Sequence, residues 1–477
     1  MKKTVGLSLA ALAIAAGIFN ADAKSFKRGV SENQFQYRAQ MEALAPGVSW
    51  YYNWGNTPSS YLANEDYMEF LPMCWNANYN AENIKNYCKQ HPEVKYILGY
   101  NEPNFKAQSN MTPAAAAQDW HKVQEIAKEC GLKIVAPALN YSPDAPYNDP
   151  MRWMDEFVAI VGLDAFDYVA LHNYGGFGVM KDLCTRFHDK YGKEVWVTEF
   201  CYWPEEGNAN SSVSPAVQIA SMVQSVLWLE QTEWIHRYAW FKAIGNATAS
   251  KGPNYGLLVP GKGEDPRELT EQGKVYVNLG TFDRSVWQPI NTFVPATEFV
   301  DQSACQVGVS ADPEYSPIEI SGFNAGAWAE YQFDVPEAGE YTLTLSVSGM
   351  GEPERFNPSL RVSLKDGDEY KSLAEKDNYQ LPNANDMYED ITFTFTLPAG
   401  HQILRLEDKN PYMPSGIRIH TLRLADASGV ELTEAAEGLG EGDGNVYTLQ
   451  GIKIGTAANL EAIPAGIYIV NGKKVKL

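Results

Sequence analysis

The stretch YILGYNEPNF, Tyr96–Phe105, is an apolar run that ends in the polar pair Asn101 and Glu102, just before a proline. A run that is apolar at consecutive positions is typical of a strand buried on both faces, as strands in parallel sheets are. Such a strand has no packing reason to end on a carboxylate. The stretch therefore indicates a parallel strand that carries a functional group at its carboxyl end.

Seven further runs of this kind lie between residues 27 and 283, namely KRGV, VSWYYNW, MEFLPMCW, KIVAPALN, DYVALHNY, EVWVTEF and RYAWFKA. Helical stretches separate several of them. In Thr112–Cys130 the threonine suits the N-cap and a proline suits the first turn, and Ser214 suits the cap of Pro215–Thr232. The first run is short, and no convincing helix separates the second from the third.

Eight such strands with crossover helices over about 250 residues predict an α/β fold, a (β/α)8 TIM barrel. The alternative is an open, doubly wound sheet. It is less favoured because no GxGxxG motif follows any of the runs.

Beyond the barrel the sequence period changes to two, in WAEYQFDV, YTLTLSV, LRVSL, ITFTFTL and ILRLED. This alternation predicts an antiparallel β-sandwich, followed by an acidic glycine-rich linker and a small β-rich C-terminal tail. The predicted organisation is a signal peptide (1–23), the barrel (24–285), a linker (286–295), the sandwich (296–425), the acidic linker (426–445) and the C-terminal segment (446–477).

The N-terminal residues have the pattern of a secretory signal peptide. Two lysines precede the apolar stretch Val5–Phe19, and small residues allow cleavage after Ala23. The apolar stretch is too short for a membrane span. We therefore expect a secreted or cell-surface monomer, in the periplasm or on the outer surface of a bacterium, with no integral membrane span.

The formal net charge of −21 argues against nucleic acid and anionic lipid as partners, and it is compatible with a neutral polysaccharide. The six cysteines show neither CxxC spacing nor a Cys/His cluster, so no zinc site is predicted. We expect free buried thiols or a single bridge. No motif predicts a metal or an organic cofactor.

Two glutamates end apolar runs, Glu102 in the fourth and Glu199 in the seventh. The carboxyl ends of all strands meet at one mouth of a (β/α)8 barrel. A lone glutamate after a strand is more often salt-bridged or turned to a loop, but a pair set among aromatics favours cleavage of a glycosidic bond. Carboxyl groups about 5 Å apart would give retention of anomeric configuration, and about 6.5–9.5 Å would give inversion.

Other residues near the predicted strand ends suit sugar binding. Aromatic rings stack on the apolar faces of sugars, although core packing is the alternative for each ring. Polar side chains can contact sugar hydroxyls or orient a glutamate, and for His172 a purely structural role is equally open. The aromatic candidates are Trp54, Trp75, Tyr202, Trp203 and Trp240, and the polar candidates are Asn101, Asn140, His172 and Tyr174.

The strings KRGV, VSWYYNWG, EFLPMCW, ILGYNEPN, VAPAL, VALHNY and VWVTEF occur in the order typical of glycoside hydrolase family 128, in clan A. The chain resembles that family over roughly residues 25 to 285, although SENQF after KRGV departs from its pattern. The resemblance implies a (β/α)8 enzyme that acts on β-1,3-glucans with retention. It implies the acid/base role for Glu102 and the nucleophile's role for Glu199.

AGAWAEYQFDVPEAGEYTLTLSVS resembles a family 6 carbohydrate-binding module, and a structural sandwich without ligand is the alternative. The ending GIYIVNGKKVKL resembles C-terminal segments of secreted Bacteroidetes proteins, some of which are sorting signals. A small β appendage is the alternative there.

These resemblances imply a secreted β-1,3-glucanase that cleaves laminarin-type glucan, endo rather than exo. A non-catalytic glucan-binding surface protein and a transglycosylase are the alternatives. A binding protein has no need of both Glu102 and Glu199, which argues against the first of these.

Overall fold

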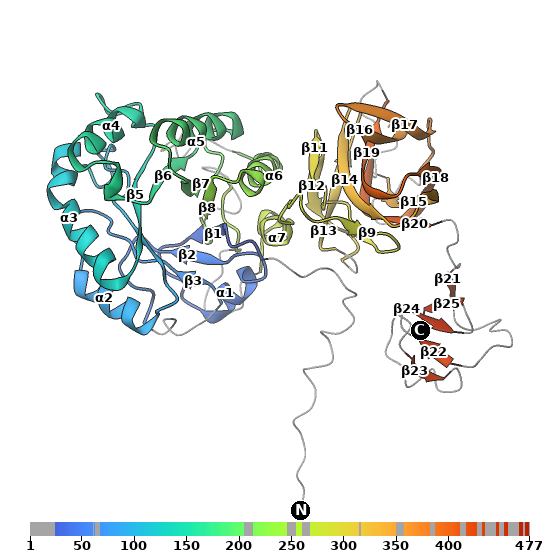
Figure 1. Cartoon of the computed structure of the whole chain (residues 1–477), viewed down its shortest axis with the longest axis horizontal. Helices are drawn as coiled ribbons and strands as arrows, with labels where there is room; N and C mark the ends of the chain where they lie inside the picture. The colour runs from blue at the N-terminus through green and yellow to red at the C-terminus, as the bar shows by residue number, and fades with distance from the viewer. Residues whose placement is uncertain are drawn as a thin grey trace, which may run out of the picture.

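The computed structural model describes residues 24–60, 62, 67–204, 213–245, 254–259, 268–313, 316–349, 357–381, 387–410, 416–426 and five short strands beyond residue 430. The predicted signal peptide, residues 1–23, lies outside the described residues. Figure 1 shows an α/β region with helices around its outside, a β region beside α6 and α7, and a small β segment at the C-terminal end.

The α/β region alternates strands and helices. Its strands are β1 (Arg28–Ser31), β2 (Trp50–Tyr52), β3 (Glu69–Phe70), β4 (Tyr96–Leu98), β5 (Lys133–Leu139), β6 (Tyr168–Asn173), β7 (Val195–Phe200) and β8 (Ile235–Phe241). Its helices are α1 (Arg38–Leu44), α2 (Ala81–Gln90), α3 (Pro113–Cys130), α4 (Pro150–Val161), the 3₁₀ turn η1 (Leu163–Ala165), α5 (Phe177–Tyr191), α6 (Pro215–Gln231) and α7 (Glu271–Asn278).

The eight strands form one parallel sheet in the order β3-β2-β1-β8-β7-β6-β5-β4. A parallel bridge between Met73 and Leu98 joins the two ends of this order. Around it, the Cys74 amide donates to the Leu98 carbonyl and the Leu98 amide to the Pro72 carbonyl, each at 2.9 Å. This arrangement fits the predicted (β/α)8 barrel.

Local sequence accounts for these elements. All six positions of β7 are buried, as expected for a strand covered on both faces. The side chains of Thr112 and Ser214 accept hydrogen bonds from the amides of Ala115 and Val217, which confirms the two predicted helix caps. Helix α3 ends at Gly131, whose left-handed φ of 69° favours glycine.

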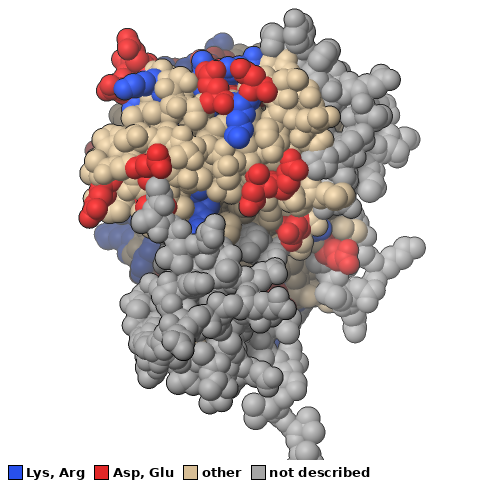
Figure 2. Space-filling view, turned by 90° about the vertical axis from the view of Figure 1, so that its right-hand side faces the viewer, with Lys and Arg blue, Asp and Glu red and all other residues tan. Residues whose placement is uncertain are grey.

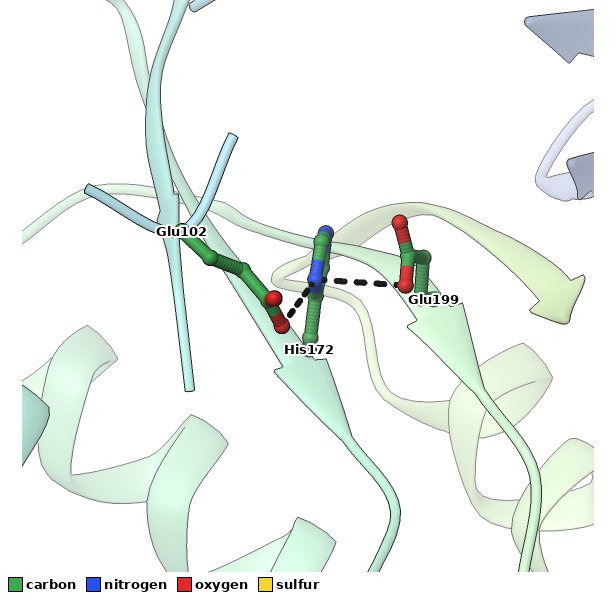
Figure 3. A group of neighbouring side chains, drawn as sticks. All are labelled: Glu102, His172 and Glu199. Atoms are coloured by element: carbon green, nitrogen blue, oxygen red, sulfur yellow. Dashed lines mark hydrogen bonds and ion pairs between the residues drawn. The ribbon is translucent and has the colours of Figure 1, made fainter. Parts of the chain in front are cut away.

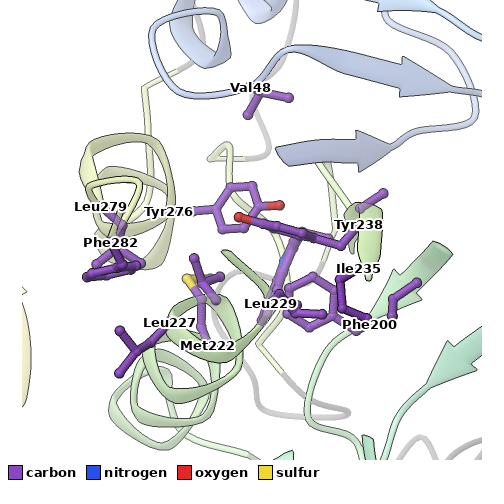
Figure 4. Packing of buried hydrophobic residues seen from close by; sticks show 14 of the residues in the cluster. Val48, Phe200, Met222, Leu227, Leu229, Ile235, Tyr238, Tyr276, Leu279 and Phe282 are labelled. Atoms are coloured by element: carbon purple, nitrogen blue, oxygen red, sulfur yellow. The ribbon is translucent and has the colours of Figure 1, made fainter. Parts of the chain in front are cut away.

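Large aromatic side chains fill the barrel interior and its wall. The rings of Trp50 and Trp196 lie inside, with centroids 5.4 Å apart and neither side chain exposed. On the side of β8, the side chains of Tyr238, Tyr276 and Met222 are buried as well (Figure 4). All of these side chains belong to one hydrophobic core.

Gly29 is where β1 passes closest to this core. A Cβ atom there would lie 2.3 Å from Cε2 of the Trp50 indole. We expect Gly29→Ala to lower the free energy of unfolding by about 1–3 kcal/mol, because a packed ring must move. Urea denaturation followed by tryptophan fluorescence measures this change. Gly178→Ala is the matched control, since a Cβ at Gly178 meets nothing within 4 Å, and an equal loss in both variants would contradict the packing argument.

The β region contains two largely antiparallel sheets. The first consists of β12 (Gln306–Val309), β13 (Ile318–Phe323), β20 (Ile417–Asp426), β15 (Gly339–Ser348) and β18 (Glu389–Leu397), with β10 (Val294–Pro295) on β20. The second consists of β11 (Asp301–Ser303), β14 (Trp328–Val335), β19 (Gly400–Asp408), β16 (Leu360–Asp366) and β17 (Glu369–Lys376), with β9 (Gln288–Pro289) on β14.

Within the stretch predicted as a linker, 286–295, the two short strands β9 and β10 pair with strands of the two sheets. The Gln231 side chain donates to the Val300 carbonyl at 2.6 Å and so ties α6 to the β region. On the face in Figure 2, lysine and arginine side chains lie close to aspartates and glutamates, with uncharged residues between them. That view shows no separate basic surface of the kind that polyanions favour.

The C-terminal segment contributes five short strands in one sheet, β21 (Leu432–Glu434), β25 (Lys473–Lys476), β24 (Ile467–Val470), β22 (Asn445–Tyr447) and β23 (Lys453–Thr456). The first of these lies within the predicted acidic linker. All six cysteines are free, which agrees with the first of the two expectations and not with a bridge, and four of them are buried. None of the helices in the described part of the chain has the length and apolar character to cross a membrane.

Candidate active site

Three titratable side chains meet at the carboxyl ends of the barrel strands. Glu199 lies near the end of β7, His172 lies in β6, and Glu102 follows β4 (Figure 3). In the parallel register of β6 and β7, His172 is paired with Glu199. All three are buried, with exposed fractions of 3% for Glu102, 0% for His172 and 4% for Glu199.

The two glutamates are close enough to flank one bond. Nδ1 of His172 lies 2.8 Å from Oε1 of Glu102 and 3.4 Å from Oε2 of Glu199. One carboxylate oxygen of each glutamate and one nitrogen of the histidine lie within 4.8 Å of one another. The fold thus brings two acidic residues that are far apart in the sequence close enough to lie on either side of one glycosidic bond.

Besides His172, three donors hold the Glu199 carboxylate. The Tyr52 hydroxyl and the Trp54 indole N–H donate to Oε1 at 2.9 and 2.8 Å. The Tyr174 hydroxyl donates to Oε2 through a short hydrogen bond. The Glu102 carboxylate accepts instead from the Asn140 amide, at 3.3 Å. The two carboxylates therefore have different surroundings, which suits different chemical roles.

The backbone is strained at two of these residues. Glu102 has a φ of 42° and Trp54 a φ of 58°, both in the left-handed region that non-glycine residues rarely adopt. The amide of Glu102 donates to the Ala138 carbonyl at 2.9 Å, so the sheet fixes this conformation. Such strain is common where a side chain must point into an active site.

Burial dominates the electrostatics of Glu199. It raises the pKa of this carboxyl above its usual range, the charge of Glu102 adds to the rise, and His172 and the donated hydrogen bonds oppose it. Burial and the charge of Glu199 also raise the pKa of Tyr52 and Tyr174 well above the usual value. Both phenols therefore stay protonated and remain donors to Glu199 at neutral pH.

The structure brings four of the predicted residues to the glutamates. Trp54, Asn140, His172 and Tyr174 contact one or both carboxylates. Trp54 was predicted to stack on a sugar ring, and the structure shows in addition that its indole N–H donates to Glu199.

The other predicted residues are not among the described contacts of the two carboxylates. Trp75 and Tyr202 are half-buried, and Trp203 packs edge-on against Tyr174 with ring centroids 6.2 Å apart. Asn101 is buried, and its amide donates to Gln108 at 3.4 Å. These residues remain candidates for sugar contacts beyond the cleaved bond.

Trp240 lies elsewhere. Its side chain is 1% exposed, its ring packs near Tyr276 of α7, and its indole N–H donates to the Tyr255 carbonyl at 2.7 Å. It is a core residue with no free ring face. Because successive strand residues point to opposite faces, the next residue, Phe241, faces Trp54 and Tyr174, at centroid distances of 6.0 and 5.3 Å.

Sequence reasoning missed Tyr52 and Phe241. For Tyr52 a signal was present, because Trp50 and Tyr52 alternate in WYY and share one face of β2. For Phe241 no signal was present, because two aromatic residues are adjacent in RYAWFKA and either could face the barrel mouth. Among the described residues, Glu102, His172 and Glu199 are also the group whose donor atoms come close enough to hold a metal ion.

Comparison with known proteins identifies the family of the barrel region. The family model described as "Glycosyl hydrolase catalytic core" matches residues 29–276, slightly more than half of the chain. Alkali-sensitive linkage protein 1 of Schizosaccharomyces pombe is 26% identical over 239 residues, which is 49% of this chain and 40% of that protein. The chain thus spans less than half the length of this curated relative.

Two solved structures with similar sequences are described as endo-β-1,3-glucanases of glycoside hydrolase family 128, subgroup II. The one from Pseudomonas viridiflava is 36% identical, over 53% of this chain and 97% of that chain, with a TM-score of 0.47. The one from Sorangium cellulosum is 30% identical over the same shares, with a TM-score of 0.44. By the match to the family model, this chain belongs to the glycosyl hydrolase catalytic core family and is a glycoside hydrolase.

Proposed function

We propose that the chain is a retaining β-1,3-glucanase of glycoside hydrolase family 128, with Glu199 as nucleophile and Glu102 as acid/base. The separation of the two carboxylates carries this proposal. One oxygen of each lies within 4.8 Å of an oxygen of the other, which is closer to the roughly 5–5.5 Å between carboxyl groups of retaining enzymes than to the 6.5–9.5 Å of inverting ones.

The reaction proceeds in two displacements. In the first, a Glu199 oxygen bonds to the anomeric carbon while Glu102 donates its proton to the leaving oxygen, which departs as the alcohol of the released sugar. In the second, Glu102 takes a proton from water, the water oxygen bonds to the anomeric carbon, and the ester to Glu199 breaks. Both side chains return to their starting states.

Sequence motifs and charge support β-1,3-glucan as the substrate. The strand-end strings from KRGV to VWVTEF resemble family 128. β-1,3-Glucan is also the polymer named for the Pseudomonas viridiflava enzyme, which is 36% identical to this chain over the aligned region. A neutral glucan also suits a chain with a net charge of −21. Endo action, export through the signal peptide and glucan binding by the β region belong to the same proposal; such binding would raise the local polymer concentration.

A time course on laminarin and on a mixed-linkage glucan tests the function. Oligosaccharides of falling size are expected from laminarin, and NMR at early times should show β-anomers as first products. Unchanged laminarin would instead support a binding protein, and lengthened chains a transglycosylase. First products in the α-configuration would contradict the double displacement.

Removing one donor to the nucleophile should weaken catalysis without unfolding the barrel. We expect Tyr174→Phe to lower kcat by about 10–100-fold, the value of one hydrogen bond to a charged group. The lost donor also lets the pKa of Glu199 rise further, so the acid limb of the pH–rate profile should move to higher pH. Tyr51→Phe is the matched control, because Tyr51 packs against Phe35 and Phe70 away from Glu199. Equal effects in both variants would contradict the role of Tyr174.

A further inference from the structure

His172 lies between the two glutamates (Figure 3). One ring atom, Nδ1, is within reach of both, at 2.8 Å from Glu102 and 3.4 Å from Glu199. The side chain is fully buried and held in β6, next to β7, which carries Glu199. The histidine is therefore fixed at one place between two groups that change charge in alternation during catalysis.

The acceptors around Nδ1 decide its protonation. An ionised carboxylate only accepts hydrogen bonds, and one N–H can be shared between two acceptors. Because Nδ1 faces two carboxylate oxygens, it carries a hydrogen and donates to both. The Asn140 amide donates to the same Oε1 of Glu102. Both N–H groups donate to Oε1 of Glu102. When Glu102 is protonated, its proton is therefore on Oε2.

We propose that His172 is a positioning residue that serves both half-reactions by sharing its Nδ1–H between Glu102 and Glu199. The inference rests on the proposed two-step mechanism. When Glu199 becomes an ester it loses its charge, while Glu102 has just given up its proton and become a carboxylate. The shared N–H then strengthens its bond to Glu102, because hydrogen bonds to charged acceptors are the stronger ones. It returns toward Glu199 when water releases the ester.

Nuclear magnetic resonance of the histidine rings tests the sharing without any substrate. The chain has seven histidines, and the signal of His172 is identified by its loss in His172→Asn. In the ¹⁵N-labelled protein, its Nδ1 should carry a proton whose resonance moves in both Glu102→Gln and Glu199→Gln. A resonance that moves in only one variant, or an Nδ1 without a proton, would overturn the proposal.

Kinetics on two substrates tests the consequence. A laminari-oligosaccharide needs the acid, whereas a dinitrophenyl β-glycoside has a leaving group that departs without a proton. We expect His172→Ala to lower kcat/KM by about 10–100-fold on both substrates, because the first displacement uses Glu199 on each of them. We also expect kcat on the dinitrophenyl glycoside to fall, because hydrolysis of the ester by Glu102 limits turnover of that substrate. His172→Asn should recover most of this loss, since its amide N–H replaces the one at Nδ1. A loss confined to the oligosaccharide would show that His172 serves Glu102 alone, and unchanged rates on both would show a structural role; either result overturns the proposal.

His188→Ala is the matched control, since His188 stacks on Trp234 and its Nδ1 lies 2.9 Å from the carbonyl of Lys193, away from the glutamates. Its activity should equal that of the wild type. Turnover of the aryl glycoside without any turnover of laminarin would contradict the proposed substrate. In that case the kinetics of His172→Ala on the aryl glycoside and the magnetic resonance of the Nδ1 proton would still test the role of His172.

Discussion

Replacing Glu199 by glutamine is expected to lower kcat on laminarin by about 10⁵-fold or more, the order of loss seen when a covalent nucleophile is removed. Glutamine fills the same space and accepts from the same donors, Tyr52 and Trp54, so the fold should be unchanged. The variant loses the negatively charged carboxylate oxygen that attacks the anomeric carbon. Steady-state release of reducing ends, with circular dichroism to check folding, measures this loss.

A rescue experiment separates loss of the nucleophile from general damage. In Glu199→Ala, azide should enter the vacated space and give a glycosyl azide of inverted, α-configuration. Glu194→Gln is the matched control, because Glu194 sits before β7 and pairs with His236 at 3.3 Å. That variant should keep wild-type activity. A Glu199→Gln enzyme with near-native activity would refute the nucleophile assignment.

Glu102→Ala should show a loss that depends on the leaving group. On laminarin we expect kcat/KM to fall by about 10²–10⁴-fold, the usual contribution of a general acid. On a dinitrophenyl β-glycoside, kcat/KM should change little, because the first displacement then needs no acid. The comparison of kcat/KM on the two substrates measures the acid role directly.

Azide again gives an independent check. In Glu102→Ala the glycosyl–enzyme still forms on Glu199, so azide should release it as the β-glycosyl azide, opposite in configuration to the product of Glu199→Ala. Glu93→Gln, an exposed position paired with His91, is the control and should behave as the wild type. An equal loss on both substrates in Glu102→Ala would show that Glu102 does not act as the acid.

Much of the catalytic region could be predicted because its signals are local. Apolar runs of strand length marked the eight strands, and the carboxylates at the ends of two runs marked Glu102 and Glu199. Parallel strands place all their carboxyl ends at one edge, so a residue's position in its own run was enough to predict that the two glutamates meet. The contact of His172 with both glutamates needed the register of β6 against β7, which the sequence does not contain.

The remaining differences have physical causes. Trp240 and Phe241 are adjacent aromatics, and which of them faces the mouth depends on the phase of β8. Trp54 reaches Glu199 because its backbone is left-handed, a conformation that nothing in WYYNWG demands. Strands β9 and β10 have two residues each, too short for a period of two to be visible in the sequence.

Trapping the covalent intermediate tests the assignment of the two glutamates most directly. The enzyme is incubated with a 2-deoxy-2-fluoro-β-laminaribiosyl fluoride, which forms the ester quickly and hydrolyses it slowly. Mass spectrometry of the digested protein should then find one added disaccharide, attached to Glu199. A label on any other side chain, or an active enzyme that turns the reagent over with inversion and no label, would contradict the assignment.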